Sequence, residues 1–277
     1  MARPIMRGDK AGSVFLAFAL VYVVWGSTCL AIRIGVREAP PVLFAGLRFL
    51  MAASPIILAY AVWHGARLPM SRRDGFVIAA TSLLMLVGGN GLVTWSEQWV
   101  QSNQAALIVA TSALWIAGFG TLGSAGEVID RATILGLLVV APMLWAAGSV
   151  LARRCPVGSA PVMTAALQIL VAGVVQTASG LALGEPARWR WTPGVLGTLL
   201  YLAIFGSCIA FGAYCWRVHQ VTPAQLATYA YVNPAVAVAL GWRVLGERFS
   251  AMQLLGTAII LVSVIAVTLA SRRRADR

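Results

Sequence analysis

The stretch PVLFAGLRFLMA, residues 41–52, returns as PVMTAALQILVA, residues 161–172, with six of twelve letters unchanged. The offset between the two stretches is 120 residues. The same offset places Trp25 of VVWGSTCLAIR on Trp145 of MLWAAGSVLARR, and an offset of 121 places residues 99–120 on residues 220–241. Three segments that recur in the same order predict a chain built from two structural repeats.

Composition indicates the solvent in which these repeats fold. The chain is 60% hydrophobic and 11% charged, and its mean hydropathy is +0.83, which is typical of an integral membrane protein. A net charge of +12 would suggest a nucleic-acid partner for a soluble protein. Here the basic residues gather at the ends of apolar segments, where they orient the chain in the bilayer, so we expect lipid and no nucleic acid as a partner.

Apolar segments of about 20 residues can cross a membrane as helices, and no ten-residue alternation typical of a membrane barrel is present. The sequence therefore predicts an all-α integral membrane protein, a helical bundle. We expect nine such segments, near residues 12–32, 41–63, 75–95, 104–123, 132–152, 161–183, 194–215, 223–242 and 251–270. The first reads as a retained helix and not as a signal peptide, because it lacks a small-residue cleavage pattern.

The two repeats are unequal in length. Residues 1–126 hold four of the expected helices and residues 127–277 hold five. One helix of the first repeat is therefore missing, and the segment 132–152 has to fill two positions of the repeat pattern.

Arg48 lies inside the second segment, where a charged side chain costs roughly 2.5–3.5 kcal/mol on insertion scales. Such a residue is expected to face a cavity or a partner, and its counterpart in the second repeat, Gln168, is also polar. The alternative is a side chain that reaches a membrane interface from a shifted helix.

Two further polar patches lie inside apolar segments. Asn90 belongs to GGNG, residues 88–91, whose small residues allow close backbone approach and weaken a helix; a packing notch is the alternative. Trp25, with Ser27 and Thr28, forms a polar and aromatic patch that hydrogen bonds between helices would equally explain.

The segment ATYAYVNPAVAVALGW, residues 227–242, carries Tyr229, Tyr231, Asn233 and Pro234 near its middle. Pro234 lacks an N–H and crowds the preceding turn, so a backbone carbonyl there loses its usual partner. We expect a helix break at Pro234 that lines a cavity, as in transporters with internal repeats. A kink that only shapes packing is the alternative.

No catalytic or metal-binding pattern is evident. The four cysteines show no C-x-x-C spacing, the two histidines are isolated, and no nucleophile with a neighbouring base or H-E-x-x-H motif occurs. We expect no enzyme activity, metal or cofactor. No apolar segment holds a carboxylate except Glu97, at a boundary, so proton coupling through a carboxylate has little support.

The chain resembles EamA-type transporters of the drug/metabolite transporter superfamily. The similarity rests on VVWGSTCLAIR (23–33), GLRFLMAASPI (46–56), GGNGLVTWSEQ (88–98), LWAAGSVLARR (144–154) and above all TYAYVNPAVAVALGWRVLGE (228–247). This resemblance implies ten helices in two inverted five-helix repeats, both termini in the cytoplasm, and export or exchange of metabolites, amino acids or drugs through a central cavity. It also implies a multi-pass protein of the bacterial inner membrane.

The chain departs from this family pattern. Besides the missing helix, Ala113 stands where a proline is usual and Cys29 where an aromatic residue is common. A second interpretation is therefore a truncated paralogue or partner subunit that does not transport. A homodimer in which a neighbour fills the gap would restore transport.

We assign the substrate pathway to residues of both repeats. Tyrosines would stack on or hydrogen-bond to a small-molecule substrate, asparagines would orient it, and Arg48 would attract an anionic group or balance freed carbonyls. The predicted pathway residues are Trp25, Arg48, Asn90, Gln168, Tyr229, Tyr231 and Asn233.

Two rules disagree on topology. Nine full crossings place the C-terminus outside with almost no bias in basic loop residues. Keeping the family orientation of the second repeat moves the C-terminus to the cytoplasm and places most basic loop residues inside. We favour the second topology.

Overall fold

The computed structural model describes residues 8–64, 70–110, 131–217 and 229–246, together with Ala251 and Ala258. Every regular element within these ranges is a helix, which confirms the all-α prediction. The elements are α1 (Gly8–Val36), α2 (Pro41–His64), α3 (Arg72–Ser82), η1 (Leu83–Asn90), α4 (Gly91–Ser96), α5 (Ser102–Ala110), α7 (Arg131–Arg154), α8 (Pro161–Ala182), η2 (Glu185–Arg188), α9 (Pro193–Tyr201), η3 (Leu202–Phe211), α10 (Gly212–Arg217) and α12 (Tyr229–Leu245).

Several helices are suited to a bilayer. Among the described residues, four helical stretches are long and apolar enough to cross a membrane, Pro41–Trp63, Arg72–Ser96, Pro161–Ala182 and Pro193–Trp216. Two shorter apolar helices are Val21–Val36 and Val232–Leu245. Residues 111–123 and 223–228, the segment 251–270 apart from residues 251 and 258, and the repeat boundary at residue 126 lie outside the described residues, so the number of segments stays a prediction.

Two of the expected helices contain a π-helical middle that the sequence did not predict. α3, η1 and α4 form one continuous stretch, and α9, η3 and α10 form another. Adding the repeat offset of 120 to the bounds of η1 gives residues 203–210, which fall inside η3. The two repeats therefore share the same irregularity at the same position.

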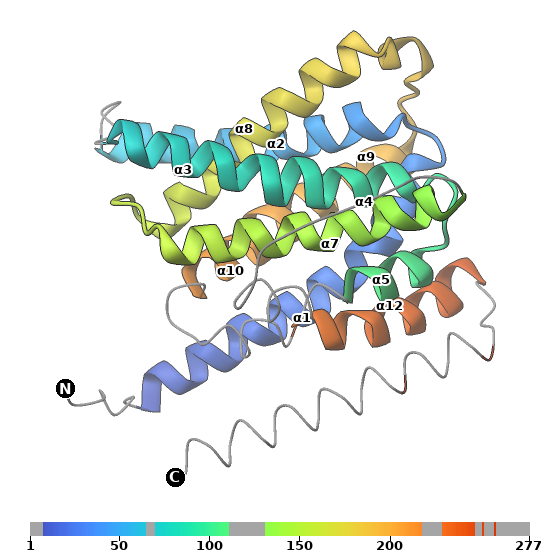
Figure 1. The fold of residues 1–277 in the computed structure, drawn as a ribbon, viewed down its shortest axis with the longest axis horizontal. Helices are drawn as coiled ribbons and strands as arrows, with labels where there is room; N and C mark the ends of the chain where they lie inside the picture. Colours follow the sequence, from blue (N-terminus) through green and yellow to red (C-terminus); the bar gives the residue numbers. More distant parts are fainter. Residues whose placement is uncertain are drawn as a thin grey trace.

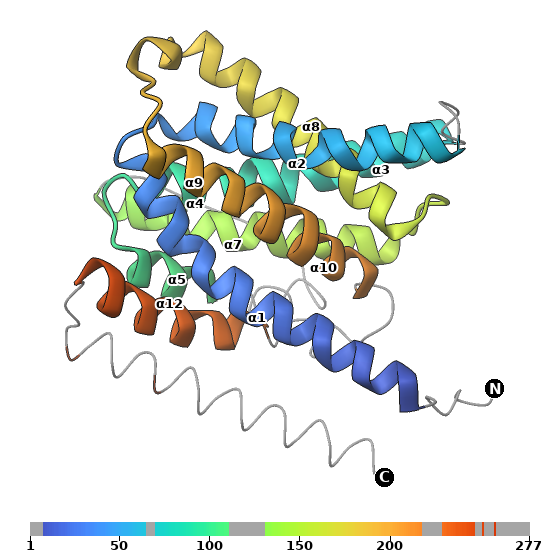
Figure 2. The same ribbon diagram turned by 180° about the vertical axis from the view of Figure 1, so that it is seen from behind.

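The helices lie side by side, with their axes across the view (Figure 1). α2 and α8 occupy one edge of the bundle, and α1 and α12 the opposite edge, with α3 to α4, α7 and α9 to α10 between them. The view from behind shows the same order (Figure 2).

The repeat partners α2 and α8 run antiparallel. A Cβ atom on Gly46 would lie 2.5 Å from the backbone nitrogen of Thr177, and one on Gly180 would lie 2.9 Å from that of Leu43. Residues further along α2 therefore contact residues nearer the start of α8. α1 and α7 likewise run in opposite directions (Figure 1). The two repeats are inverted.

Side chains fix where the helices begin. Both carboxylate oxygens of Glu185, which is 3% exposed, accept hydrogen bonds from the first backbone amides of α2, at 3.4 Å from Val42 and 2.6 Å from Leu43. These amides have no partner within their own helix. The loop after α8 therefore anchors the start of its repeat partner.

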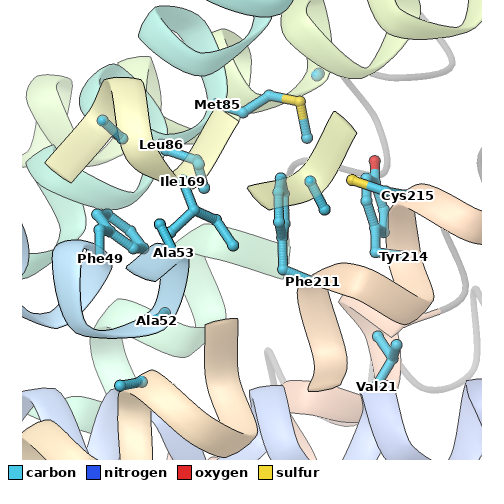
Figure 3. Close-up of a cluster of buried hydrophobic side chains, with 14 residues drawn as sticks. Val21, Phe49, Ala52, Ala53, Met85, Leu86, Ile169, Phe211, Tyr214 and Cys215 are labelled. Carbon is cyan, nitrogen blue, oxygen red and sulfur yellow. The ribbon is translucent and has the colours of Figure 1, made fainter. Parts of the chain in front are cut away.

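A hydrophobic cluster fills the centre of the bundle (Figure 3). Phe49, Ala52 and Ala53 of α2 meet Ile169 of α8 and Phe211 of η3, and all five are at most 2% exposed. The small alanines let the helices approach closely, as is typical of membrane helix interfaces. This cluster supports one side of the cavity described next.

Candidate functional site: a cavity between the repeats

A cavity of about 90 Å³ lies between the repeats, several times the roughly 10–15 Å³ that one water molecule needs. Its lining comes from α1, α2, η1, α4 and α5 of the first repeat and from α7, η3 and α12 of the second. Aromatic walls are provided by Trp25, Phe49, Trp145 and Phe211. Polar groups are provided by Thr28, Arg48, Asn90, Ser207 and Asn233.

Arg48 joins the two π-helices. Its Nε donates to Ser207 Oγ of η3 at 3.1 Å, and its Nη1 donates to Asn90 Oδ1 of η1 at 3.4 Å. The side chain is 3% exposed, and its guanidinium carbon also lies 4.8 Å from the ring centroid of Phe49. A buried charge is thus held by neutral acceptors from both repeats, and the alternative of an arginine that reaches the membrane interface does not fit this geometry.

Two repeat-equivalent tryptophans meet at the cavity. The rings of Trp25 and Trp145 lie edge to face, 5.3 Å between centroids and 88° between planes. Tyr214 packs against both, at 5.2 Å and 5.7 Å. The hydroxyl of Tyr214 donates to Ser149 Oγ at 2.6 Å, which fixes this aromatic group.

The π-helices carry carbonyls that side chains satisfy. Trp25 Nε1 donates to the carbonyl of Gly206 in η3 at 3.2 Å. The equivalent carbonyl in η1, that of Leu86, accepts from Gln176 Nε2 at 3.0 Å. Irregular backbone within a membrane protein needs such internal partners, so these side chains support the π geometry.

The helix break expected at Pro234 is absent. α12 continues through Pro234 as a single α-helix from Tyr229 to Leu245, because proline removes one hydrogen bond while its φ remains helical. The helix approaches α1 closely here: a Cβ atom on Gly26 would lie 2.5 Å from Val236 Cβ and 3.2 Å from the carbonyl oxygen of Asn233. Asn233, 7% exposed, lines the cavity from this crossing.

The predicted pathway residues divide into three groups. Trp25, Arg48, Asn90 and Asn233 line one cavity. Gln168 does not; its Nε2 donates to Thr81 Oγ1 at 2.6 Å between α8 and α3. The side chains of Tyr229 and Tyr231, in the first turn of α12, lie outside the described residues.

Sequence reasoning missed several lining residues. Ser207 and Phe211 belong to η3, which has no GGNG-like pattern to mark it. Trp145 was aligned with Trp25 by the repeat but was not assigned to the pathway. Its equivalence to a predicted pathway residue was the available signal.

Glu97 lies closer to the site than its boundary position suggested. It directly follows α4, is fully buried, and interacts electrostatically with Arg48. Its backbone carbonyl accepts a hydrogen bond from Arg33 Nη1.

Within the ranges that the structure describes, no three His, Cys, Asp or Glu side chains gather as metal ligands.

Known proteins resemble both halves of the chain. The EamA-like transporter family matches residues 12–141 and residues 132–269, and the two matches overlap at 132–141, within the segment predicted to fill two positions. A solved structure titled "Crystal structure of protein" shares the fold, with a TM-score of 0.69 at 17% identity, over 96% of this chain and 99% of that one.

Two curated relatives span nearly the whole chain. "Uncharacterized inner membrane transporter YedA" of Escherichia coli (strain K12) is 38% identical over 292 residues, covering 95% of this chain and 93% of the relative. "Uncharacterized transporter YoaV" of Bacillus subtilis is 23% identical over 289 residues, covering 94% and 98%. Because 95% of 277 residues is about 263, about 29 of the 292 aligned positions have no counterpart here, roughly the length of one membrane helix and a loop.

Proposed function

Because the chain belongs to the EamA-like transporter family, we propose that it exports or exchanges small metabolites, amino acids or drugs by opening the cavity between its repeats alternately to either side of the membrane. It is a multi-pass membrane protein, and the bacterial inner membrane named for its Escherichia coli relative is the location we assign to it.

One observation carries this proposal. A single cavity takes its lining from helices of both inverted repeats, and Arg48 bonds to the equivalent π-helix of each. Rocking one repeat against the other would change which side of such a cavity is open, as in other transporters with inverted repeats. We assign transport and not catalysis, since relatives that cover the chain are named transporters.

Labelling of single cysteines tests alternating access without a known substrate. Val109 lines the cavity on α5, whereas Val195 is fully buried away from it. In a background without native cysteines, we expect Val109→Cys to react with a membrane-impermeant methanethiosulfonate both in intact cells and in inverted vesicles. Val195→Cys, made by the same exchange, should react in neither.

The outcomes separate the proposal from its alternative. Reaction of Val109→Cys from one side only would favour a shortened paralogue or subunit that does not transport. Reaction from neither side, with normal protein levels, would contradict a water-accessible cavity.

A further inference from the structure

The cavity lining has an unbalanced charge. Arg48 is its one charged side chain among the described residues, and the hydrogen bonds that place it end on neutral oxygens of Ser207 and Asn90. Those two bonds use two of the five N–H groups of a guanidinium. A buried cation of this kind is stabilised by an anion that reaches it.

The charged side chains at and near the cavity have a net charge that one negative charge would neutralise. Glu97 acts electrostatically on Arg48, and Arg33 reaches the backbone carbonyl of the same glutamate. Two arginines and one glutamate carry a formal charge of +1 together. A monoanion would neutralise this group, whereas a dianion would leave it negative.

A second buried donor belongs to a residue that lines the same cavity. The indole nitrogen of Trp145 is buried and has no hydrogen-bond partner among the described residues. Its repeat partner Trp25 donates to the carbonyl of Gly206, but the matching carbonyl of Leu86 is already bonded to Gln176. The N–H of Trp145 thus belongs to a cavity-lining residue and lacks the acceptor that symmetry would supply.

We propose that the cavity binds an organic monocarboxylate, with its carboxylate held by Arg48 and by the indole N–H of Trp145. A planar carboxylate matches the guanidinium fork and offers oxygens to a further donor. The apolar body of the ligand packs against Phe49, Phe211 and the ring of Trp25. This inference rests on the proposed function, since it names the class of substrate for the same cavity.

Three matched ligands test the class. Isothermal titration calorimetry on the purified full chain would compare phenylacetate, phenylacetamide and phenethylamine, which present an anion, a neutral amide and a cation on the same ring. We expect phenylacetate to bind at least tenfold more tightly than either of the others. Equal or tighter binding of the amide or the amine, or binding of none, overturns the proposal.

Four variants test the donors. Arg48→Gln should abolish the preference for phenylacetate over the amide. Trp145→Phe, which removes the N–H and keeps a smaller aromatic ring at the site, should weaken phenylacetate binding about three- to tenfold. Trp189→Phe is the matched control, because its indole nitrogen is also buried without a described partner but lies in another cluster. Glu97→Gln should tighten phenylacetate binding by removing a competing charge.

Equal effects of the two tryptophan changes would overturn the role of Trp145, even if the Arg48 variant fails to fold. Preference for the amide or amine, together with labelling of Val109→Cys from both sides, would leave transport in place and reject the carboxylate. Absence of both binding and labelling would reject both proposals.

Discussion

At the scale of single residues, the repeats reach similar backbone geometry with different side chains. The carbonyls of Leu86 and Gly206 are equivalent by the repeat offset, yet one accepts from Gln176 and the other from Trp25. The π-helices therefore depend on donors that the internal repeat does not predict, since each donor comes from a non-equivalent helix.

Replacement of Gln176 by leucine should lower the unfolding free energy by about 1–3 kcal/mol, because it leaves the buried carbonyl of Leu86 without its side-chain donor. Denaturation in a fixed detergent measures the change. Gln98→Leu is the control: its amide bonds only to Trp95, three residues earlier, so we expect a change within about 0.5 kcal/mol. A Gln176 variant as stable as the control would contradict the role of this donor.

Arg48 lines the cavity, whereas its repeat partner Gln168 does not. The repeat aligned the two residues correctly, but their neighbours differ: Arg48 faces the π-helices, whereas Gln168 meets Thr81 and accepts a hydrogen bond from Cys215 Sγ at 3.5 Å. Which polar side chain faces a cavity is decided by the helices packed against it, and a repeat in the sequence does not specify those.

At the scale of helices, glycine controls how closely α2 and α8 cross. The atoms that would meet a Cβ on Gly46 or Gly173 include backbone nitrogens, of Thr177 and Leu50, at 2.5 and 2.9 Å. Backbone cannot turn away as a flexible side chain can. The interface that relates the repeats therefore tolerates no larger residue at these positions without separation of the helices.

Gly46→Ala should accordingly destabilise the protein by about 1–3 kcal/mol, as overpacking does. Gly212→Ala in α10 is the matched control, since no described atom beyond its own helix backbone and chain neighbours lies within 4 Å of its added Cβ. There the better helix propensity of alanine should stabilise by up to about 1 kcal/mol. Thermal unfolding of both variants gives the comparison, and equal shifts of the same sign would disprove close packing at Gly46.

Hydropathy located the helices well but not their internal geometry. The expected segments 75–95 and 194–215 coincide with continuous helical stretches, and the small residues of GGNG do lie at the end of η1. Leu202–Phe211 also carries small residues, Gly206, Ser207 and Cys208, but without a polar asparagine among glycines they did not single the segment out. Residue composition does not specify whether a helix forms α-type or π-type hydrogen bonds. The sequence analysis therefore expected a weakened helix only at residues 88–91.

At the scale of the whole molecule, several arginines gather at the end of the bundle where α1 begins. The start of α3, the end of α7 and the end of α10 lie at the end from which α1 sets out (Figure 1). They carry Arg72, Arg73, Arg153, Arg154 and Arg217. With Arg3, Arg7 and Lys10 at the start of the chain, these arginines lead us to expect this end in the cytoplasm under the positive-inside rule.

The C-terminus should lie in the cytoplasm as well. α12 ends at the opposite end of the bundle, so one further crossing by the segment 251–270 would return the tail SRRRADR to the end where α1 begins. A fluorescent protein fused to the C-terminus should fluoresce, while an alkaline phosphatase fusion should stay inactive. The reverse pattern would show that the tail is periplasmic.

The resemblance to EamA-type transporters predicted inverted repeats, and the antiparallel packing of α2 and α8 agrees with that prediction. Sequence alone left two topologies open, because four helices before the second repeat would make the copies parallel. The antiparallel contacts of Gly46 and Gly180 favour the family orientation despite the shorter first repeat. Orientation in the membrane is thus set by packing between equivalent helices as well as by their number.

The paired π-helices also order events in the history of the gene. A π-turn closes its hydrogen bond over one more residue than an α-turn does, so an inserted residue can be accommodated as a π-turn within an α-helix. η1 and η3 occupy equivalent positions in the two repeats. A single insertion in an ancestral half-length protein, followed by duplication of that gene, would account for both and would make the irregular helix older than the two-repeat chain.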